Sequence, residues 1–348
     1  MKQVIRYLPD REKRRTEDLW REAFPEDSQA FIDYYYKEKT RDNRILVKEE
    51  DGRIVSMLQR NPYRMALGGR TETIDYIVAV ATAADSRHRG HMRQLLGRML
   101  KDMYEERQPF TFLMPADEAI YRPFQFAYIC GQEKWKEAEA AAGLSRVSVE
   151  SEADSEAAAA YMERWLSGRY QVYCRRDKAY VRRLLAELAS ENGRLEALLE
   201  HGRLAGLFAD WGLEKREQRL LMTDEAFSRP AKDCPPGMMA RVAWLPGFLG
   251  LFKLREDSAV KSVRLRLAVH DPMIAENCGE FLWTVEKSGA SAARLETVGG
   301  QGENLVPRLE LTADVLVQWL FGYGEGRNLA EKFPDIGVLD RVFIDEVV

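Results

Sequence analysis

The 348-residue sequence contains few cysteines, few histidines and little net charge. Its four cysteines are far apart and form no C-x-x-C pair, which indicates neither a zinc site nor a disulfide framework, so we expect buried or incidental thiols. A formal charge of −4 argues against a nucleic-acid-binding surface, because phosphate binding needs a clustered excess of Lys and Arg. A weakly acidic protein would instead suit a cationic substrate.

Long apolar runs are also absent. None reaches the roughly 20 residues that a membrane-spanning helix needs, and the first residues, M-K-Q-V-I-R, lead into charged sequence instead of the apolar core of a signal peptide. With 45% hydrophobic and 31% charged residues, the composition is that of a soluble globular chain with two or three domains. We therefore predict a cytoplasmic protein that contacts no membrane.

The most informative pattern is a strand, a loop, a helix and a second strand in direct succession. An apolar strand at 74–80 leads into the loop R-H-R-G-H-M at 87–92, and a helix follows. The apolar side chains of this helix recur at helical spacing, which predicts a single stripe facing a sheet. They are Met92, Leu95, Leu96, Met99, Leu100 and Met103. Pro109 ends the helix, and a buried strand is predicted at 110–114.

The loop between this strand and helix has the features of an anion site. Gly90 lets a ligand approach the backbone without a Cβ in the way, and the free amides at the start of the next helix point towards it. The loop lacks both the G-K-[ST] of a P-loop and the three glycines of a dinucleotide fingerprint. The alternative for an arginine-rich turn is a solvated helix cap. For His88 and His91, contact with a phosphate or plain exposure is a simpler role than metal binding.

Ahead of this segment the sequence predicts two short helices and a hairpin. The helices at 16–23 and 28–37 are rich in aromatic residues, which either line a substrate mouth or pack half-buried. Strands at 44–48 and 53–60 form a hairpin closed by a D-G pair. The alanine-rich, acidic stretch at 137–156 marks a transition between domains.

A weaker copy of this pattern follows. Residues 199–207 repeat the form of the first hairpin at 50–58 and are preceded by a helix at 177–191, but no arginine-glycine loop comes after them. Prolines at 230, 235 and 236 mark the next boundary. We interpret this region as a degenerate copy of the first domain.

The last third of the chain has a different character. Strands of alternating polarity are predicted at 263–268, 279–286 and 293–298. Thr312 can cap a helix that carries an apolar stripe. This stripe either lines a groove, closes the core of the domain or makes a subunit contact. The alternating apolar residues of 340–348 predict an ordered terminal strand.

The anion loop resembles the acyl-CoA loop of the GNAT superfamily of N-acetyltransferases. That pattern is Arg or Gln, two residues, Gly, one residue, then Gly or Ala, directly after a strand. Here it falls on Arg87, Gly90 and Met92, and Met92 departs from the small residue usual at the last place. The segment M-P-A-D-E-A-I-Y at 114–121 also aligns with the family without gaps.

The order of the three parts resembles the enhanced intracellular survival (Eis) family of acetyltransferases. This resemblance implies an α+β (mixed α/β) fold. It places a catalytic GNAT acetyl-CoA-binding domain at 1–150, a degenerate GNAT-like domain at 151–236 and a C-terminal α+β domain similar to sterol carrier proteins at 237–348. Family members often assemble as hexamers, so a homo-oligomer is expected.

The resemblance also implies which residues hold acetyl-CoA. Backbone amides of Val80, Ala81 and Thr82 would pair with its pantetheine, and Ala116 and Asp117 would flank that arm from the neighbouring strand. The residues expected to hold the pyrophosphate are Arg87, His88, Arg89, Gly90, His91, Met92 and Arg93. No metal is expected.

In the family, the tyrosine of the I-Y pair is the general acid and the terminal carboxylate of the chain is the base. Those roles fall on Tyr121 and Val348, with Glu346 and Asp345 as the alternative bases. Acyl transfer to an amine needs both, since the amine must lose a proton and the departing thiolate must gain one.

The sequence thus predicts an acetyl-CoA-dependent N-acetyltransferase that transfers the acetyl group directly. The implied substrate is a primary amine of a small polycationic molecule, for example an aminoglycoside, or a lysine side chain. Two alternatives stay open: a non-catalytic acyl-CoA-binding or regulatory protein, and a lipid-binding scaffold that acts through the C-terminal domain.

Overall fold

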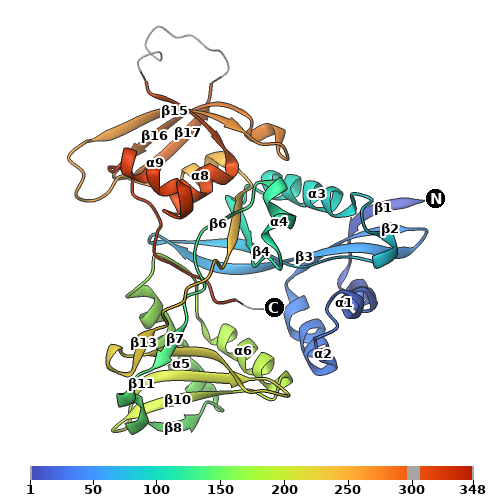
Figure 1. The fold of residues 1–348 in the computed structure, drawn as a ribbon, viewed down its shortest axis with the longest axis vertical. Coiled ribbons are helices and arrows are strands. Elements are labelled where there is room, and N and C mark those ends of the chain that lie inside the picture. The colour runs from blue at the N-terminus through green and yellow to red at the C-terminus, as the bar shows by residue number, and fades with distance from the viewer. Residues whose placement is uncertain (1, 296–305, 347–348) are drawn as a thin grey trace.

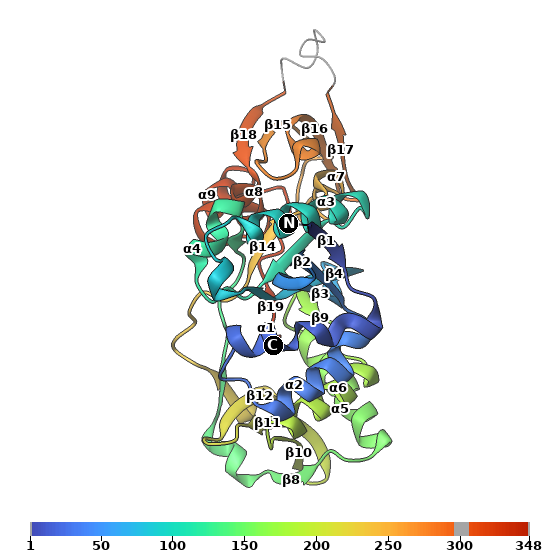
Figure 2. The ribbon, with the colours of Figure 1, turned by 90° about the vertical axis from the view of Figure 1, so that its right-hand side faces the viewer.

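Three groups of elements lie one above another along the long axis of the molecule in a computed structural model, which describes residues 2–295 and 306–346 (Figure 1). A nine-stranded sheet forms the middle group, and a group with its own sheet and helices lies on either side of it. The view from the side in Figure 2 shows the same stacking. No helix in the described part is long and apolar enough to span a bilayer.

The middle sheet collects strands from the whole length of the chain. Its strands are β1 (Gln3–Tyr7), β2 (Arg44–Glu50), β3 (Arg53–Leu67), β4 (Arg70–Thr82), β5 (Phe110–Leu113), β6 (Ala127–Tyr128), β9 (Val172–Cys174), β14 (Met239–Val242) and β19 (Val342–Phe343). The main order is β1-β2-β3-β4-β5-β14-β6, while β9 pairs with the far end of β3 and β19 pairs with β9. Of these pairs, β4 with β5 and β9 with β19 are parallel, and the others are antiparallel.

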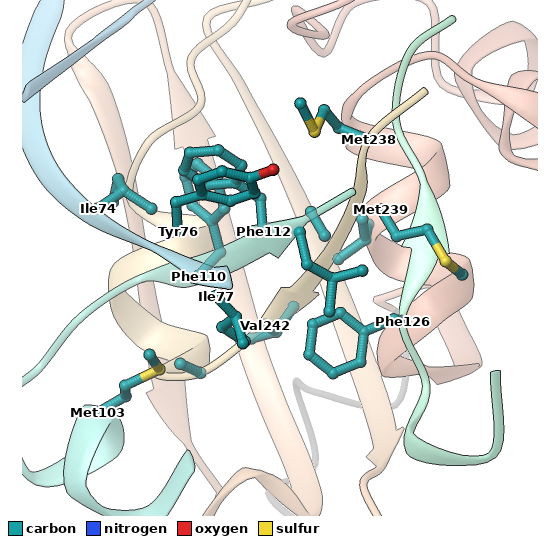
Figure 3. Packing of buried hydrophobic residues seen from close by; sticks show 14 of the residues in the cluster. Ile74, Tyr76, Ile77, Met103, Phe110, Phe112, Phe126, Met238, Met239 and Val242 are labelled. Atoms are coloured by element: carbon teal, nitrogen blue, oxygen red, sulfur yellow. The ribbon is translucent and has the colours of Figure 1, made fainter. Parts of the chain in front are cut away.

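The predicted strand, loop, helix and strand are confirmed as β4, α3 (His91–Glu105) and β5. The apolar stripe of α3 is buried against the sheet from Leu95 to Met103, as its spacing requires, and Met92 at its start is half-buried. Figure 3 shows where the stripe ends: Met103 lies beside the buried side chains of Ile77 from β4, Phe110 from β5 and Val242 from β14.

The two predicted N-terminal helices are α1 (Glu17–Ala23) and α2 (Gln29–Glu38), on the side of the sheet away from α3 (Figure 1). The side chain of Ser28 caps α2 by accepting from the Phe31 amide. Among the aromatic residues, Trp20 and Tyr35 are buried, and their ring centroids are 4.5 Å apart. For these two residues the packing interpretation is confirmed.

The central group repeats the element order of the first. Helices α5 (Glu152–Ser167) and α6 (Lys178–Ser190) precede three antiparallel strands, β10 (Arg194–Glu200), β11 (Arg203–Trp211) and β12 (Glu217–Thr223). Both hairpins turn through two residues with positive φ, Asp51 (48°) and Gly52 (87°) in the first and His201 (50°) and Gly202 (83°) in the second. The chain then continues into β13 (Ser228–Pro230), which pairs with β7 (Trp135–Glu137), and the second copy has no counterpart of α3 in the described residues.

Two strands lie across the predicted domain boundaries. β8 (Ser145–Ser148), expected within the first domain, pairs with β10 in the central sheet, and β14, expected within the last domain, lies between β5 and β6 in the middle sheet. The predicted transition at 137–156 contains β8 and the start of α5, whose N-terminus Ser151 and Asp154 cap with a capping box. Without β14, the edge of β5 away from β4 would lack a partner, so the middle sheet is completed only after the central group.

The C-terminal group is a sheet of order β17-β16-β15-β18 with helices packed on it. Its elements are α7 (Leu245–Leu249), β15 (Ser262–His270), β16 (Gly279–Glu286), β17 (Gly289–Arg294), β18 (Arg308–Thr312), α8 (Ala313–Leu320) and α9 (Arg327–Lys332). The predicted strands 263–268 and 279–286 are confirmed, and the third ends at Arg294, with 296–298 outside the described residues. Thr312 stands at the N-cap of α8 without a side-chain cap bond. The rings of Trp283 and Trp319 are fully buried and 5.7 Å apart, so the stripe of α8 closes the core of this group.

Candidate active site

β4 and β5 are parallel neighbours that pair only at Tyr76 and Phe112. The rings of these two residues stack with centroids 4.9 Å apart and close the narrow end of the gap between the strands (Figure 3). Beyond Tyr76, the edge of β4 that faces β5 pairs with no described strand, although β4 stays paired with β3 as far as Thr82. This open edge offers backbone donors and acceptors to an extended ligand.

The open part of β4 contains a β-bulge. Met57 pairs with Ala81 and Gln59 pairs with Val78, so two residues of β4 lie opposite one residue of β3. Ala79, in the bulge, has a φ of 49°, which is strained for a residue with a Cβ. The bulge turns the backbone at the point where the two strands diverge.

The backbone after the bulge determines which amides face the gap. The Ala83 amide donates to the Val55 carbonyl of β3 at 3.0 Å, and backbone directions alternate along a strand, so Ala81 also points to β3. Val80 and Thr82 therefore present their amides to the open edge. Of the three residues predicted to pair with a pantetheine arm, Val80 and Thr82 thus face the open edge and Ala81 faces β3.

The loop after β4 ends in a left-handed glycine. Gly90 has φ 76° and ψ 15° and is the N-cap of α3, where it provides no side-chain cap. The first helical hydrogen bond runs from the Gln94 amide to the Gly90 carbonyl, so the amides before Gln94 in the first turn are free of helical partners. The first turn contains no acidic residue. A 15-residue helix with these open amides favours an anion at its N-terminus.

The arginines of the loop differ in their surroundings. Arg87 donates from Nε to a backbone carbonyl of β4 at 3.3 Å, and Arg93 stacks over the ring of Phe124 at 4.9 Å. Neither of them has an ion-pair partner among residues 2–295 and 306–346. Arg89 lies 3.7 Å from the Glu50 carboxylate. Arg87 and Arg93 thus leave uncompensated positive charge beside the free amides, while His88 is exposed at a φ of 62°.

His91 differs from the prediction for its side chain. The imidazole is 4% exposed, and neither ring nitrogen has a hydrogen-bond partner in the described part of the chain. Burial and the nearby Lys48 ammonium lower its pKa, so the ring is neutral near pH 7. The side chain therefore points into the protein, so the predicted exposure of His91 is wrong. Its neighbour Met92 is half-buried, so a side chain larger than the usual Gly or Ala fits here by packing inwards.

Tyr121 ends the short helix α4 (Glu118–Tyr121), which follows β5. Its side chain is 8% exposed and its ring packs edge-on to Phe126, with centroids 5.8 Å apart. Burial raises the pKa of Tyr121 to about 12, and no described residue hydrogen-bonds its hydroxyl. The group is therefore a protonated phenol throughout the physiological range. Of the two residues expected to flank the ligand, Ala116 is exposed, and Asp117 uses its carboxylate to cap α4 through the Ala119 amide at 2.9 Å.

The C-terminal segment runs to the narrow end of the gap. The Tyr76 hydroxyl donates to the backbone carbonyl of Glu346 at 3.4 Å. The guanidinium of Arg176, which is fully buried, forms ion pairs with Asp345 and Glu346. The predicted terminal strand is confirmed for Val342–Phe343, and Val348 lies outside the described residues.

The charges around the C-terminal segment argue against the Glu346 carboxylate as the catalytic base. Burial alone would raise the pKa of Glu346, but Arg176, Lys39 and Arg219 outweigh burial and hold it below its usual value. The Tyr180 hydroxyl also donates to Glu346 at 3.2 Å. A carboxylate so strongly stabilised in its charged form is a weak proton acceptor.

A cavity of about 160 Å³ near this segment is lined by residues 39 and 42, just after α2, and by residues of β3 and α6. Tyr63 and Tyr180 line it, and the ring of Tyr63 lies 6.0 Å from that of Tyr76. Its charged groups are mostly paired, for example Arg183 with Asp42 at 3.0 Å and Lys39 with Glu187 at 3.3 Å. The lining is thus of mixed sign.

Sequence reasoning missed the bulge at Ala79 and the buried arginines Arg176 and Arg241. Ala79 had a weak signal, since it is a small residue at the end of an apolar strand. The two arginines had none, because their buried partners lie 169 and 170 residues away for Arg176 and 30 residues away for Arg241.

Two family models match the chain. One, described as an acetyltransferase (GNAT) domain, matches residues 4–129, and the other, described as a sterol carrier protein domain, matches residues 245–332. None of the curated proteins compared with the chain matches it.

Three solved structures are similar over almost the whole chain. A probable N-acyltransferase from Enterococcus faecalis has a TM-score of 0.77 at 15% identity, with all of both chains covered. A GCN5-related N-acetyltransferase from Anabaena variabilis has a TM-score of 0.73 at 15% identity, covering 99% of this chain and 100% of that one. Eis1 from Mycobacterium abscessus has a TM-score of 0.69 at 13% identity, with the same coverage. At these identities the similarity establishes the fold.

Proposed function

We propose that this chain, whose residues 4–129 match an acetyltransferase (GNAT) domain and whose fold is similar to that of Eis1, transfers an acetyl group from acetyl-CoA directly to a primary amine. The observation that carries the proposal is the continuity of two features on one stretch of chain. The open edge of β4 leads through the loop into the free N-terminus of α3. An extended arm and a pyrophosphate, which acetyl-CoA joins in one molecule, fit this succession.

In this proposal the pantetheine pairs with Val80 and Thr82 like an added strand, and the pyrophosphate lies at Gly90 with Arg87 and Arg93. The strained bulge at Ala79 supports a further role for the β4 backbone. In this role an amide beside the bulge would donate to the thioester carbonyl, and such a donor stabilises the oxyanion of the tetrahedral intermediate.

Tyr121 is the proposed general acid. Because its pKa is raised to about 12, the phenol is fully protonated at neutral pH and has a proton to donate as the thiolate departs. The proposed base is the terminal carboxylate of Val348. What supports it is the position of Glu346, whose carbonyl accepts from Tyr76 at the narrow end of the gap, and the weak basicity of the Glu346 side chain.

The amine is proposed to enter the cavity beside Tyr63 and Tyr180. The aromatic faces of Tyr63 and Tyr180 would hold an ammonium group, since the carboxylates of Asp42 and Asp177 already pair with Arg183 and Arg64. Because the cavity measures about 160 Å³, it suits an aminoalkyl end, such as that of lysine or a polyamine, better than a whole aminoglycoside. The rest of a longer molecule would lie in the adjacent hollow of about 390 Å³, which shares Ala179 and Arg183 with it.

Thiol release from acetyl-CoA tests the proposal, with spermine, a lysine-containing peptide and kanamycin as amines. Amine-dependent release, with the acetylated product identified by mass spectrometry, is expected. Tight acetyl-CoA binding without release from any amine would instead support a non-catalytic acyl-CoA-binding protein. Lipid retained in native mass spectra would support the scaffold alternative, and the sedimentation coefficient tests the expected homo-oligomer.

A further inference from the structure

Arg241 is a buried guanidinium with every contact inside the protein. It lies in β14 and is completely buried. Its Nε donates to the Phe124 carbonyl at 2.7 Å, Nη1 donates to the Val242 carbonyl at 2.6 Å, and Nη2 pairs with Asp271 at 2.5 Å. Because the guanidinium is planar and each of its three nitrogens has a partner, it fixes the Phe124 and Val242 carbonyls and the Asp271 carboxylate relative to one another.

Asp271, in the C-terminal group, is held as firmly as its partner. Its Oδ1 accepts from the amides of Met273 at 2.8 Å and Ile274 at 2.9 Å. Its Oδ2 accepts from Asn277 at 3.1 Å, and Asn277 also donates to the Ala243 carbonyl at 3.0 Å, next to β14. The carboxylate is therefore a fixed point in the C-terminal group.

Phe124 belongs to the turn that follows the proposed acid. Within the turn, the Phe126 amide donates to the Tyr121 carbonyl at 3.4 Å. From outside, Arg241 holds the Phe124 carbonyl, and the Ala313 amide of α8 donates to the Gln125 side chain at 3.3 Å. The turn 121–126 is thus connected to the C-terminal group directly through Ala313 and indirectly through Arg241 of β14, which pairs with Asp271.

We infer that Arg241, anchored by Asp271, is a positioning residue that sets the location of the Tyr121 hydroxyl for proton transfer. The inference rests on the proposed function, because it takes Tyr121 as the general acid. It gives the C-terminal group a role in catalysis that requires no ligand of its own.

The position of Tyr121 depends on this turn because little else holds its hydroxyl. No described residue hydrogen-bonds the hydroxyl, so backbone placement and the contact with Phe126 determine where it lies. Proton transfer needs a donor within hydrogen-bond reach, and a displacement of about 1 Å can lower a rate about 100-fold.

Arg241→Lys in the full-length protein tests this positioning. Lysine keeps the buried positive charge, but a single ammonium does not reproduce the fork to both Phe124 and Asp271. With acetyl-CoA and the most active amine of the panel, kcat should fall about 10- to 100-fold while the KM for acetyl-CoA changes less than about threefold. In a Tyr121→Phe background the same change should cost nothing further, since the proton it positions is already gone.

Arg60→Lys is the matched control. Arg60 is equally buried in the middle sheet and pairs with Asp75 and Glu106, away from the turn 121–126. Its replacement should leave kcat within about threefold, as expected of a structural site. A 19F NMR signal from 3-fluorotyrosine at position 121 adds a readout independent of turnover, and it should shift in Arg241→Lys and not in Arg60→Lys.

The outcomes separate the inference from the proposed function. An equal loss in the wild-type and Tyr121→Phe backgrounds, or an unchanged 19F signal, would overturn the positioning role and leave Tyr121 as the acid. Full turnover by Tyr121→Phe would instead refute the acid itself, and with it the catalytic meaning of the contact. If Arg241→Lys does not fold, Asp271→Asn and Gln125→Asn replace it, and the same pattern is expected with smaller losses.

Discussion

Substitutions at Gly90 separate backbone strain from charge at the anion site. The residue has a φ of 76°, and a Cβ built on it meets no atom within 4 Å. Gly90→Ala therefore carries no steric clash, only the left-handed conformation, which costs roughly 1 to 2 kcal/mol for a residue with a side chain. A fall of Tm by roughly 1–3 °C is expected, because an unfolding entropy of about 2.1 cal/mol/K per residue gives about 1.4 °C per kcal/mol for 348 residues.

Gly90→Gln and Gly90→Glu add side chains of nearly equal size that differ in charge. A carboxylate about 5 Å from one phosphate charge is repelled by about 0.8 kcal/mol at a dielectric constant of 80 and about 3.3 kcal/mol at 20. Gly90→Glu should thus bind acetyl-CoA about 4- to 300-fold more weakly than Gly90→Gln. Both should keep the stability of Gly90→Ala.

Calorimetric titration of the three variants with acetyl-CoA, at low salt and at about 0.5 M salt, measures their affinities. Salt should reduce the difference in affinity between Gly90→Gln and Gly90→Glu, because it screens exposed charges. Thermal unfolding supplies the control for folding. If the glutamate variant bound acetyl-CoA as tightly as the glutamine variant at low salt, no phosphate would lie near Gly90, and the assignment of this loop would be wrong.

Three further predictions concern the chemistry and the C-terminal segment. Tyr121→Phe keeps the packing on Phe126 and should lower kcat about 10²- to 10⁴-fold while the affinity for acetyl-CoA stays unchanged. Wild-type turnover under conditions where chemistry limits the rate would show that Tyr121 only packs. Since burial raises the pKa of Tyr121 to about 12, kcat should show no Tyr121-dependent decline between about pH 8 and 10, and a descending limb that Tyr121→Phe abolishes would contradict this. A C-terminal extension should reduce turnover severely without changing the affinity for acetyl-CoA, and so should deletion of Val348, which withdraws the terminal carboxylate by about 3.5 Å. A C-terminally tagged protein with full activity would eliminate Val348 as the base. The pKa of Glu346 is lowered in the folded protein, so the ionised side chain stabilises the fold above its unfolded pKa, and this stabilisation is lost as the pH falls through the folded pKa. Glu346→Gln should therefore weaken the dependence of the free energy of unfolding on pH in the acid range. An unchanged dependence would argue against this.

Local patterns in the sequence were sufficient for most of the elements and for the course of the anion loop. The stripe of α3, the D-G and H-G turns of the two hairpins and the glycine before α3 each depend on residues close in sequence. Helical periodicity and positive φ are properties of short segments, so they are legible without knowledge of their partners. The resemblance to a known family added the predicted roles of Tyr121 and Val348, which no local pattern implied.

The tertiary structure alone decided which segments meet. It placed β14 in the middle sheet, turned the His91 ring inwards and directed the Ala81 amide to β3. It also brought the buried Arg176 to the Glu346 carboxylate and the buried Arg241 to the Phe124 carbonyl. Composition and periodicity distinguish buried faces from exposed ones, but an arginine that is buried by its partner has the same sequence signature as one in solvent. Its position is fixed by the free energy of a long-range contact, because a guanidinium leaves water only where carboxylate or carbonyl oxygens from distant segments replace its hydration.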